Sequence, residues 1–113
     1  KYGTYMRQIV EYSISQGVIP ILGTKADNIE GNNSINAEIA AIANEYDIPL
    51  WNFWAAAHPL PNNGFDLSLN DGFHLSVGKS YYFDNPANME RAWPVRNLTA
   101  LQVLDAVRNG LNK

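Results

Sequence analysis

The chain has 113 residues, the length of one domain, and its 46% hydrophobic and 12% aromatic content is enough for a packed core. The net charge of −3 comes from 11 acidic and 8 basic residues without a run of either sign, so we expect no nucleic-acid partner. No apolar stretch is long enough to span a bilayer. The absence of cysteine excludes disulfides, thiolate metal sites and cysteine nucleophiles, and it leaves the compartment undecided, with secretion still open.

The N-terminal segment predicts a helix followed by a short strand. Apolar residues recur at helical spacing over Tyr2–Gln16, and Gly17 stands where a helix end favours a left-handed residue. The wholly apolar run 18–22 is typical of a strand buried on both faces, as in parallel sheets. Pro20 argues against that strand, because proline has no N–H to donate.

A second helix and strand follow in the same order. Residues 23–33 are polar and rich in glycine and asparagine, which predicts a loop. Ser34 is the predicted N-cap of a helix whose apolar face runs to Tyr46, and Ile48–Asn52 is the second predicted strand. The order helix, strand, helix, strand is typical of an α/β fold with a parallel sheet.

The segment from Phe53 to Arg96 lacks clear periodicity. Apart from a helical turn expected at Phe53–Ala57, prolines and glycines punctuate it, and such long irregular stretches in a compact domain are often functional. Regular spacing returns in a C-terminal helix, for which Asn97 is the predicted cap.

The sheet predicted in this way is incomplete. Two parallel strands need further strands at their edges and helices on both faces. The chain starts at Lys1 and enters a helix at once. We therefore expect either more chain before Lys1 or another subunit that supplies the rest of the sheet.

One motif in the irregular segment carries chemistry. Histidine transfers protons near neutral pH, and a carboxylate bonded to one ring N–H leaves the other nitrogen free to act as a base. Asp71 and His74 are three residues apart, and Gly72 eases the bend between them. The spacing alone is a weak signal, but the motif lies beyond the last strand, on the side where α/β folds bind ligands.

These residues resemble the C-terminal half of the SGNH hydrolases, the GDSL-like lipases and esterases. The resemblance covers nearly the whole chain and includes the segments 17–22, 24–28, 48–54, 71–76 and 94–101. Among these segments, Asp71-x-x-His74 matches the last functional sequence block of the family. The other segments indicate a shared fold and common ancestry. The resemblance implies a partial doubly wound, flavodoxin-like three-layer α/β fold. Residues 1–113 would then be the C-terminal portion of one SGNH-type domain.

The resemblance also implies a function and a missing part. His74 would be the general base and Asp71 its orienting partner in the hydrolysis of acyl or acetylated-sugar esters, without cofactor or metal. The family's nucleophile belongs to a Gly-Asp-Ser block, which is absent from this sequence, and the oxyanion-hole glycine and asparagine have no match. This chain alone should be nearly inert, and the missing half or a partner chain would complete it.

Several alternatives remain open at the level of sequence. Six serines are possible substitutes for the nucleophile, although none lies in a recognisable elbow: Ser13, Ser15, Ser34, Ser68, Ser76 and Ser80. His58 is expected to be structural, and Lys25 and Asp27 follow the first strand, where they would touch a ligand or only solvent. Five aromatic residues would line an acyl or sugar groove or simply pack: Trp51, Phe53, Trp54, Phe65 and Phe73.

Two other functions compete with the hydrolase. One is a non-catalytic assembly or binding protein that completes its sheet by oligomerising, since unpaired strand edges favour such pairing. The other is a carbohydrate-binding module that uses the tryptophans.

Overall fold

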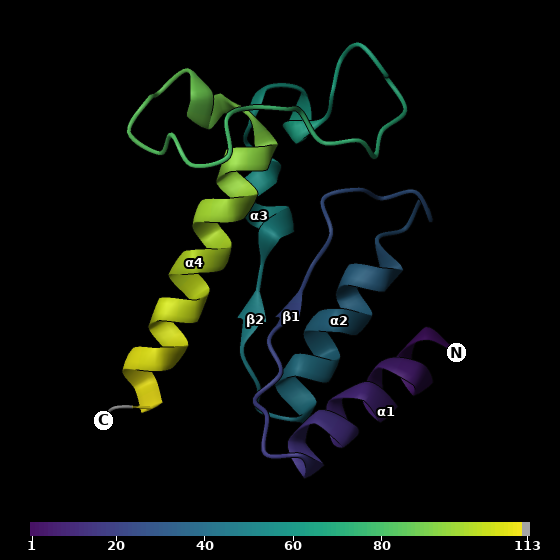
Figure 1. Cartoon of the computed structure of the whole chain (residues 1–113). Coiled ribbons are helices and arrows are strands. Elements are labelled where there is room, and N and C mark those ends of the chain that lie inside the picture. The colour runs from purple at the N-terminus through teal and green to yellow at the C-terminus, as the bar shows by residue number, and fades with distance from the viewer. Residues whose placement is uncertain (112–113) are drawn as a thin grey trace.

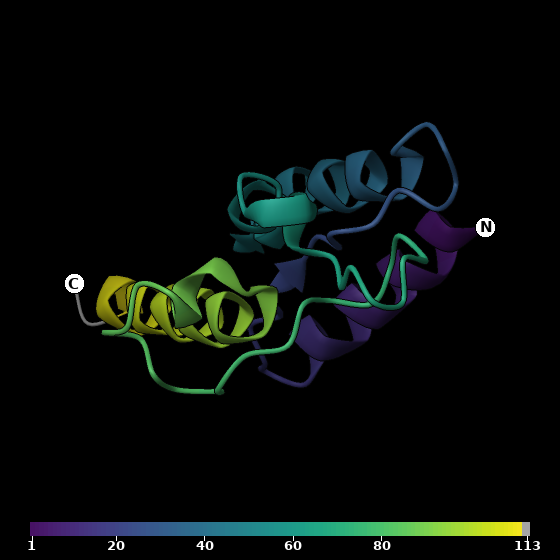
Figure 2. The ribbon, with the colours of Figure 1, turned by 90° about the horizontal axis from the view of Figure 1, so that it is seen from above.

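The computed structural model describes residues 1–111, which form helices around a small parallel sheet (Figure 1). The elements in chain order are α1 (Tyr2–Ser15), β1 (Leu22–Gly23), α2 (Ser34–Glu45), β2 (Leu50–Trp51), α3 (Phe53–Ala57), two 3₁₀ turns (Pro61–Gly64 and Asn88–Glu90) and α4 (Ala92–Leu111). Seen from above, α4 lies apart from the pair α1 and α2, with the strands between them (Figure 2).

The two strands are parallel, as the sequence predicts, but they are short. Leu22 pairs with Leu50 and Gly23 with Trp51. The prediction of a strand over residues 18–22 is therefore wrong for most of its length. Pro20 has no N–H for a ladder, and the preceding Val18 is 56% exposed rather than buried. What the structure establishes is a mixed α/β chain with a two-stranded parallel sheet.

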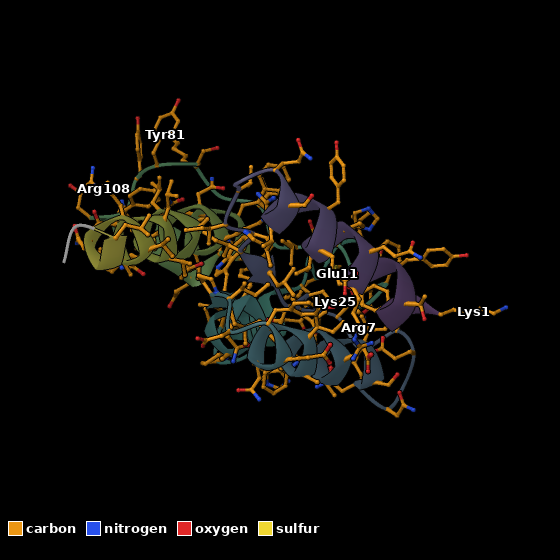
Figure 3. All side chains as sticks on the ribbon, turned by 90° about the horizontal axis from the view of Figure 1, so that it is seen from below. Lys1, Arg7, Glu11, Lys25, Tyr81 and Arg108 are labelled. Atoms are coloured by element: carbon orange, nitrogen blue, oxygen red, sulfur yellow. The ribbon has the colours of Figure 1, made fainter. Side chains whose placement is uncertain are left out.

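The first core lies between α1, α2 and β1. It consists of Val10, Leu22, Ile39, Ile42 and Ala43, all nearly inaccessible to solvent. Arg7 of α1 supports it from the rim through ion pairs with Glu38, at 3.2 Å, and Glu45, at 3.0 Å, and its side chain lies between the two helices in Figure 3. The apolar spacing therefore predicts the packed face of α2, whereas on α1 Met6 and Val10 reach the core and Tyr5 and Ile9 are more than half exposed.

The second core joins α3 to the start of α4 through Phe53, Ala57 and Ala92. The predicted turn at Phe53–Ala57 is confirmed as α3. Beyond this core, the second half of α4 leaves Leu101, Leu104 and Leu111 more than half exposed. Among residues 1–111, none of the helices is both long and apolar enough to cross a membrane.

Both predicted helix caps are wrong. Asn33, in the left-handed conformation with φ of 55°, is the N-cap of α2, and Ser34 is the first helical residue. Asn97 lies within α4, where its side-chain amide donates to the carbonyl oxygen of Ser80 at 3.0 Å. The helix starts earlier because Pro94 falls in its first turn, where a missing N–H is harmless, and because Ser76 binds the first two N–H groups.

Candidate active site

The predicted motif lies in a loop at the end of the molecule toward which both strands point (Figure 1). Phe65 and Leu75 form an antiparallel bridge at the base of this loop. The N–H of Asp66 donates to the carbonyl of His74 at 2.9 Å, and the N–H of Ser76 donates to the carbonyl of Gly64 at 2.8 Å. These bonds close residues 66–74 into one hydrogen-bonded loop.

Asp66 organises the first half of the loop, a role that the sequence analysis missed. Its carboxylate accepts hydrogen bonds from the N–H of Ser68 at 2.8 Å, the Ser68 hydroxyl at 2.5 Å and the N–H of Leu69 at 3.4 Å. The Ser68 hydroxyl is the main reason that the pKa of Asp66 is lowered. An aspartate two residues before a serine is a known turn signal, so the sequence did contain an indication that Asp66 organises this loop.

Asp71 and His74 are brought together at the other end of the loop. One carboxylate oxygen of Asp71 accepts hydrogen bonds from the backbone N–H groups of Phe73, at 3.1 Å, and His74, at 2.9 Å. The other oxygen contacts Nδ1 of the His74 ring. Gly72 has a φ of +76°, a conformation that favours glycine, and this bend places both side chains on one side of the backbone.

The electrostatics of the pair follow from these bonds. The backbone N–H of His74 is the largest cause that lowers the pKa of the Asp71 carboxyl to about 2. Desolvation, the second largest effect, raises the pKa, and the N–H of Phe73 and the imidazole of His74 lower it. Asp71 is therefore a fixed anion near neutral pH. The side chain of His74 is 55% exposed, and its Nε2 makes no hydrogen bond to any residue from 1 to 111.

The aromatic residues do not form one groove. Only the ring of Phe73 lies beside His74, with centroids 4.5 Å apart, and Phe73 is 49% exposed. Phe53 is buried in the second core, and the indole N–H of Trp51 donates to Thr99 at 2.9 Å. Trp54 packs against the ring of His58, with centroids 4.4 Å apart. Among residues 1–111, the ring that packs against the His74 imidazole is that of Phe73, while Phe65 lies in the backbone bridge to Leu75 at the base of the loop.

Ser76, the serine nearest in sequence to the motif, has a structural role. It is 5% exposed, and its Oγ accepts the N–H of Ala92 at 2.8 Å while its carbonyl accepts the N–H of Trp93 at 3.1 Å. These bonds join the loop to the start of α4. Three further serines use their hydroxyls locally: Ser13 donates to the carbonyl of Ile9, Ser15 to the carbonyl of Tyr12, and Ser68 to Asp66.

Lys25 and Asp27 are paired with each other rather than aimed at a ligand. The ammonium group of Lys25 lies 2.6 Å from Asp27 and 2.6 Å from Glu30. The buried amide of Asn36 accepts from the N–H of Lys25 at 2.9 Å and donates to its carbonyl at 2.7 Å. This network holds the loop after β1. Within the described range 1–111, no three His, Asp or Glu side chains gather as a metal site.

No family model, curated protein or solved structure matches the chain. The resemblance to the SGNH hydrolases therefore stays a prediction from the sequence.

Proposed function

We propose that Asp71 and His74 are the acid–base pair of a serine ester hydrolase of SGNH type. The observation that carries the proposal is that Asp71 binds one ring nitrogen of His74 while the other faces solvent. In such a pair the carboxylate orients the imidazole and stabilises the imidazolium that forms when a serine hydroxyl loses its proton.

The anchoring of Asp71 supports this role. Because its second oxygen is held by the backbone N–H groups of Phe73 and His74, the carboxylate stays charged and cannot rotate away from the ring. A hydrogen bond from Nδ1–H to this carboxylate leaves the Nε2 lone pair as the acceptor. His74 would then take a proton from the nucleophile and deliver it to the leaving alcohol.

The nucleophile would come from outside the 113 residues. The sequence has no Gly-Asp-Ser block, and Ser76 is committed to the start of α4. We propose that residues 1–113 are the C-terminal portion of a single doubly wound, three-layer SGNH-type domain. Further strands would pair with the open edges of β1 and β2 and bring the serine and the oxyanion donors. The substrate would be an acyl or acetylated-sugar ester.

The tautomer of His74 is a direct test on the chain itself. Long-range ¹H–¹⁵N spectra at alkaline pH should show the His74 proton on Nδ1, because Asp71 accepts from that atom. Asp71→Asn should remove this preference. His58 is an internal control, since its ring packs on Trp54 and has the amide of Asn63, and no carboxylate of residues 1–111, within hydrogen-bond distance. A His74 proton on Nε2 in the unmodified chain would contradict the assigned roles.

Activity of the complete enzyme is the second test. The neighbouring coding sequence should encode a strand followed by Gly-Asp-Ser, and the whole protein should hydrolyse p-nitrophenyl acetate. His74→Ala and Asp71→Asn should each lower kcat by about 10⁴-fold. His58→Ala should leave kcat within about twofold of the unmodified enzyme, because His58 is exposed and outside the pair, and a surface substitution of this kind usually changes stability by no more than about 0.5 kcal/mol. Near-normal turnover in either Asp71→Asn or His74→Ala would reject the proposal.

An assembly protein is the second candidate, and the surface of α1 favours it. Tyr2, Tyr5, Ile9 and Tyr12 are exposed and form one stripe at helical spacing, next to the face that packs on α2. Such a stripe, together with the two open sheet edges, suits self-association. Size-exclusion chromatography with a fluorophosphonate probe separates the two functions. If the protein made from the complete coding sequence associates with itself and does not react with the fluorophosphonate, the assembly function is favoured.

A further inference from the structure

The ring of Phe73 lies outside both hydrophobic cores. Phe73 is 49% exposed, and neither the core between α1 and α2 nor the core between α3 and α4 includes it. A large apolar side chain stabilises the fold in proportion to the area that it buries, so a half-exposed ring contributes little in that way. What the ring does contact is the imidazole of His74, with centroids 4.5 Å apart and planes tilted by 36°.

The contact between these two rings depends on a bend in the backbone. In extended backbone, consecutive side chains point to opposite faces, and neighbouring rings do not meet. Residues 71–74 form a bend instead, in which Gly72 has a φ of +76°. The N–H groups of Phe73 and His74 both donate to one oxygen of Asp71, at 3.1 Å and 2.9 Å. The bend that anchors the carboxylate therefore also brings the two rings together.

The backbone on both sides of His74 is fixed. The N–H of Asp66 donates to the carbonyl of His74 at 2.9 Å, which closes residues 66–74 into the His74 loop. On the other side, Ser76 donates its N–H to the carbonyl of Gly64 and accepts the N–H of Ala92 through Oγ, both at 2.8 Å. The position of the His74 backbone is therefore set independently of its side chain.

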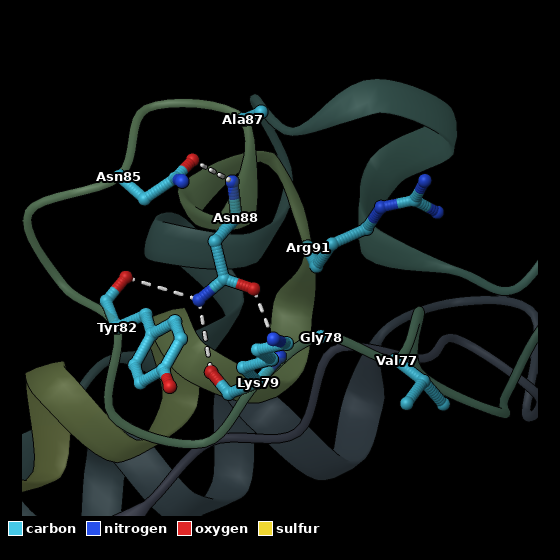
Figure 4. A pocket seen from close by; sticks show the side chains of 8 residues that line it. All are labelled: Val77, Gly78, Lys79, Tyr82, Asn85, Ala87, Asn88 and Arg91. Atoms are coloured by element: carbon cyan, nitrogen blue, oxygen red, sulfur yellow. Dashed lines mark hydrogen bonds between the residues drawn. The ribbon is translucent and has the colours of Figure 1, made fainter.

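The segment that follows the His74 loop is held by one amide, that of Asn88. Its oxygen accepts the N–H of Lys79 at 2.8 Å, and its nitrogen donates to the carbonyls of Lys79 at 2.9 Å and Tyr82 at 3.0 Å (Figure 4). Gly78 lets this segment approach α4, because a Cβ there would lie 3.0 Å from Cβ of Arg91. Both ends of the His74 loop are thus tied to the fold, and the freedom that remains is that of the imidazole itself.

Two contacts restrict the imidazole. Asp71 binds Nδ1, which fixes one atom of the ring but leaves the ring free to turn about that hydrogen bond. The ring of Phe73 lies against the imidazole and limits this turn. Such a turn displaces Nε2, the nitrogen that would take the proton, and a misplacement of about 1 Å can lower a rate by about 100-fold.

The aromatic ring also suits the charge that proton transfer would create. A histidine that accepts a proton from a nucleophile becomes an imidazolium for part of the reaction. The face of an aromatic ring attracts a cation that lies within about 6 Å of its centroid. The distance of 4.5 Å between the rings of Phe73 and His74 meets this condition. A leucine would fill a similar volume without this attraction.

From these observations we propose that Phe73 is a positioning residue, whose ring fixes the plane of the His74 imidazole and stabilises the imidazolium. The inference rests on the proposed function, since the plane of the ring matters for turnover only if His74 acts as the base. Asp71 determines which nitrogen carries the proton, and Phe73 determines where the other nitrogen points. Phe73 acts through His74 and need not touch the substrate.

Ring-current shifts test the contact on the 113-residue chain. The Cδ2 and Cε1 protons of His74 should shift in Phe73→Leu, which keeps the backbone N–H that Asp71 accepts, and should stay near their original positions in Phe73→Tyr. Trp54→Leu is the matched control, since Trp54 and His58 form the other aromatic–histidine pair among residues 1–111, with centroids 4.4 Å apart. It should shift the ring protons of His58 and leave those of His74 unchanged. Urea unfolding of each variant reports whether it is folded.

Turnover of the complete enzyme tests the positioning role. Phe73→Leu should lower kcat for p-nitrophenyl acetate by about two- to tenfold, the range of an aromatic or cation–π contact, while KM stays within about twofold. Phe73→Tyr should restore kcat, because it returns the aromatic face. A general loss of structure would not be rescued in this way.

Three outcomes would overturn the inference. The ring protons of His74 would be the same in Phe73→Leu as in the unmodified chain, Trp54→Leu would shift them equally, or Phe73→Leu would turn over ester at the unmodified rate. The acid–base role fails separately: a His74 proton on Nε2 refutes that role, whereas a proton on Nδ1 without any ring-current effect of Phe73 refutes only the inference.

Discussion

Replacing Ser76 with alanine removes the acceptor for the first N–H of α4. Ala92 is fully buried, so in the variant its N–H would have neither Oγ of Ser76 nor water as a partner. An unsatisfied buried donor destabilises a protein by about 1–3 kcal/mol. For a chain of this size each kcal/mol lowers Tm by roughly 4 °C, so we expect Tm to fall by about 4–12 °C.

Urea unfolding followed by circular dichroism measures the loss in the free energy of unfolding, and thermal unfolding measures the fall in Tm. Ser80→Ala is the matched control. The hydroxyl of Ser80 makes no hydrogen bond to the described part of the chain, since only its carbonyl accepts a bond, from Asn97. We expect that variant to stay within about 0.5 kcal/mol of the unmodified chain. If Ser76→Ala were equally harmless, the hydrogen bond to Ala92 would not stabilise the fold and Ser76 would again be open as a nucleophile.

Two further predictions concern the His74 loop. The carboxyl of Asp71 has a pKa of about 2 in place of its ordinary 3.8, so its contribution to stability is complete above the ordinary value and is lost as the pH falls toward 2. The backbone amides of Phe73 and His74 should therefore lose protection from hydrogen exchange over this acid range, and unchanged protection at the lowest pH would contradict the anchoring bonds. Gly72→Ala forces an alanine to a φ of +76° where nothing contacts it, and should destabilise the chain by about 1 kcal/mol and disturb the tautomer of His74. Gly31→Ala, at a φ of +92° in another open loop, is the control. It should lower the free energy of unfolding in urea as much as Gly72→Ala does, while leaving the tautomer of His74 unchanged. If both substitutions changed the His74 tautomer equally, the local explanation would be refuted.

Local patterns predicted the extent of α1 and α2 well, the start of α4 less well, since it begins at Ala92 and not after Asn97, and the strands poorly. The apolar spacing before Gly17 gave α1 to within one residue, because a helix of this kind is stabilised by a face that the sequence itself displays. A strand has no such internal support. The run 18–22 is apolar throughout, yet pairing is confined to Leu22 and Gly23, since it depends on the register of the partner β2.

The sequence by itself determined the chemistry that is available here: one carboxylate and one imidazole three residues apart, a glycine between them, and no Gly-Asp-Ser block. Only the tertiary structure decided that the backbone N–H groups of the turn fix Asp71 against Nδ1 of His74, that Ser76 is committed to the start of α4, and that Asn88 holds the segment after the His74 loop. The physical reason is that hydrogen-bond partners and cavities arise between segments distant in sequence, whereas residue types and helical periodicity are properties of a segment alone.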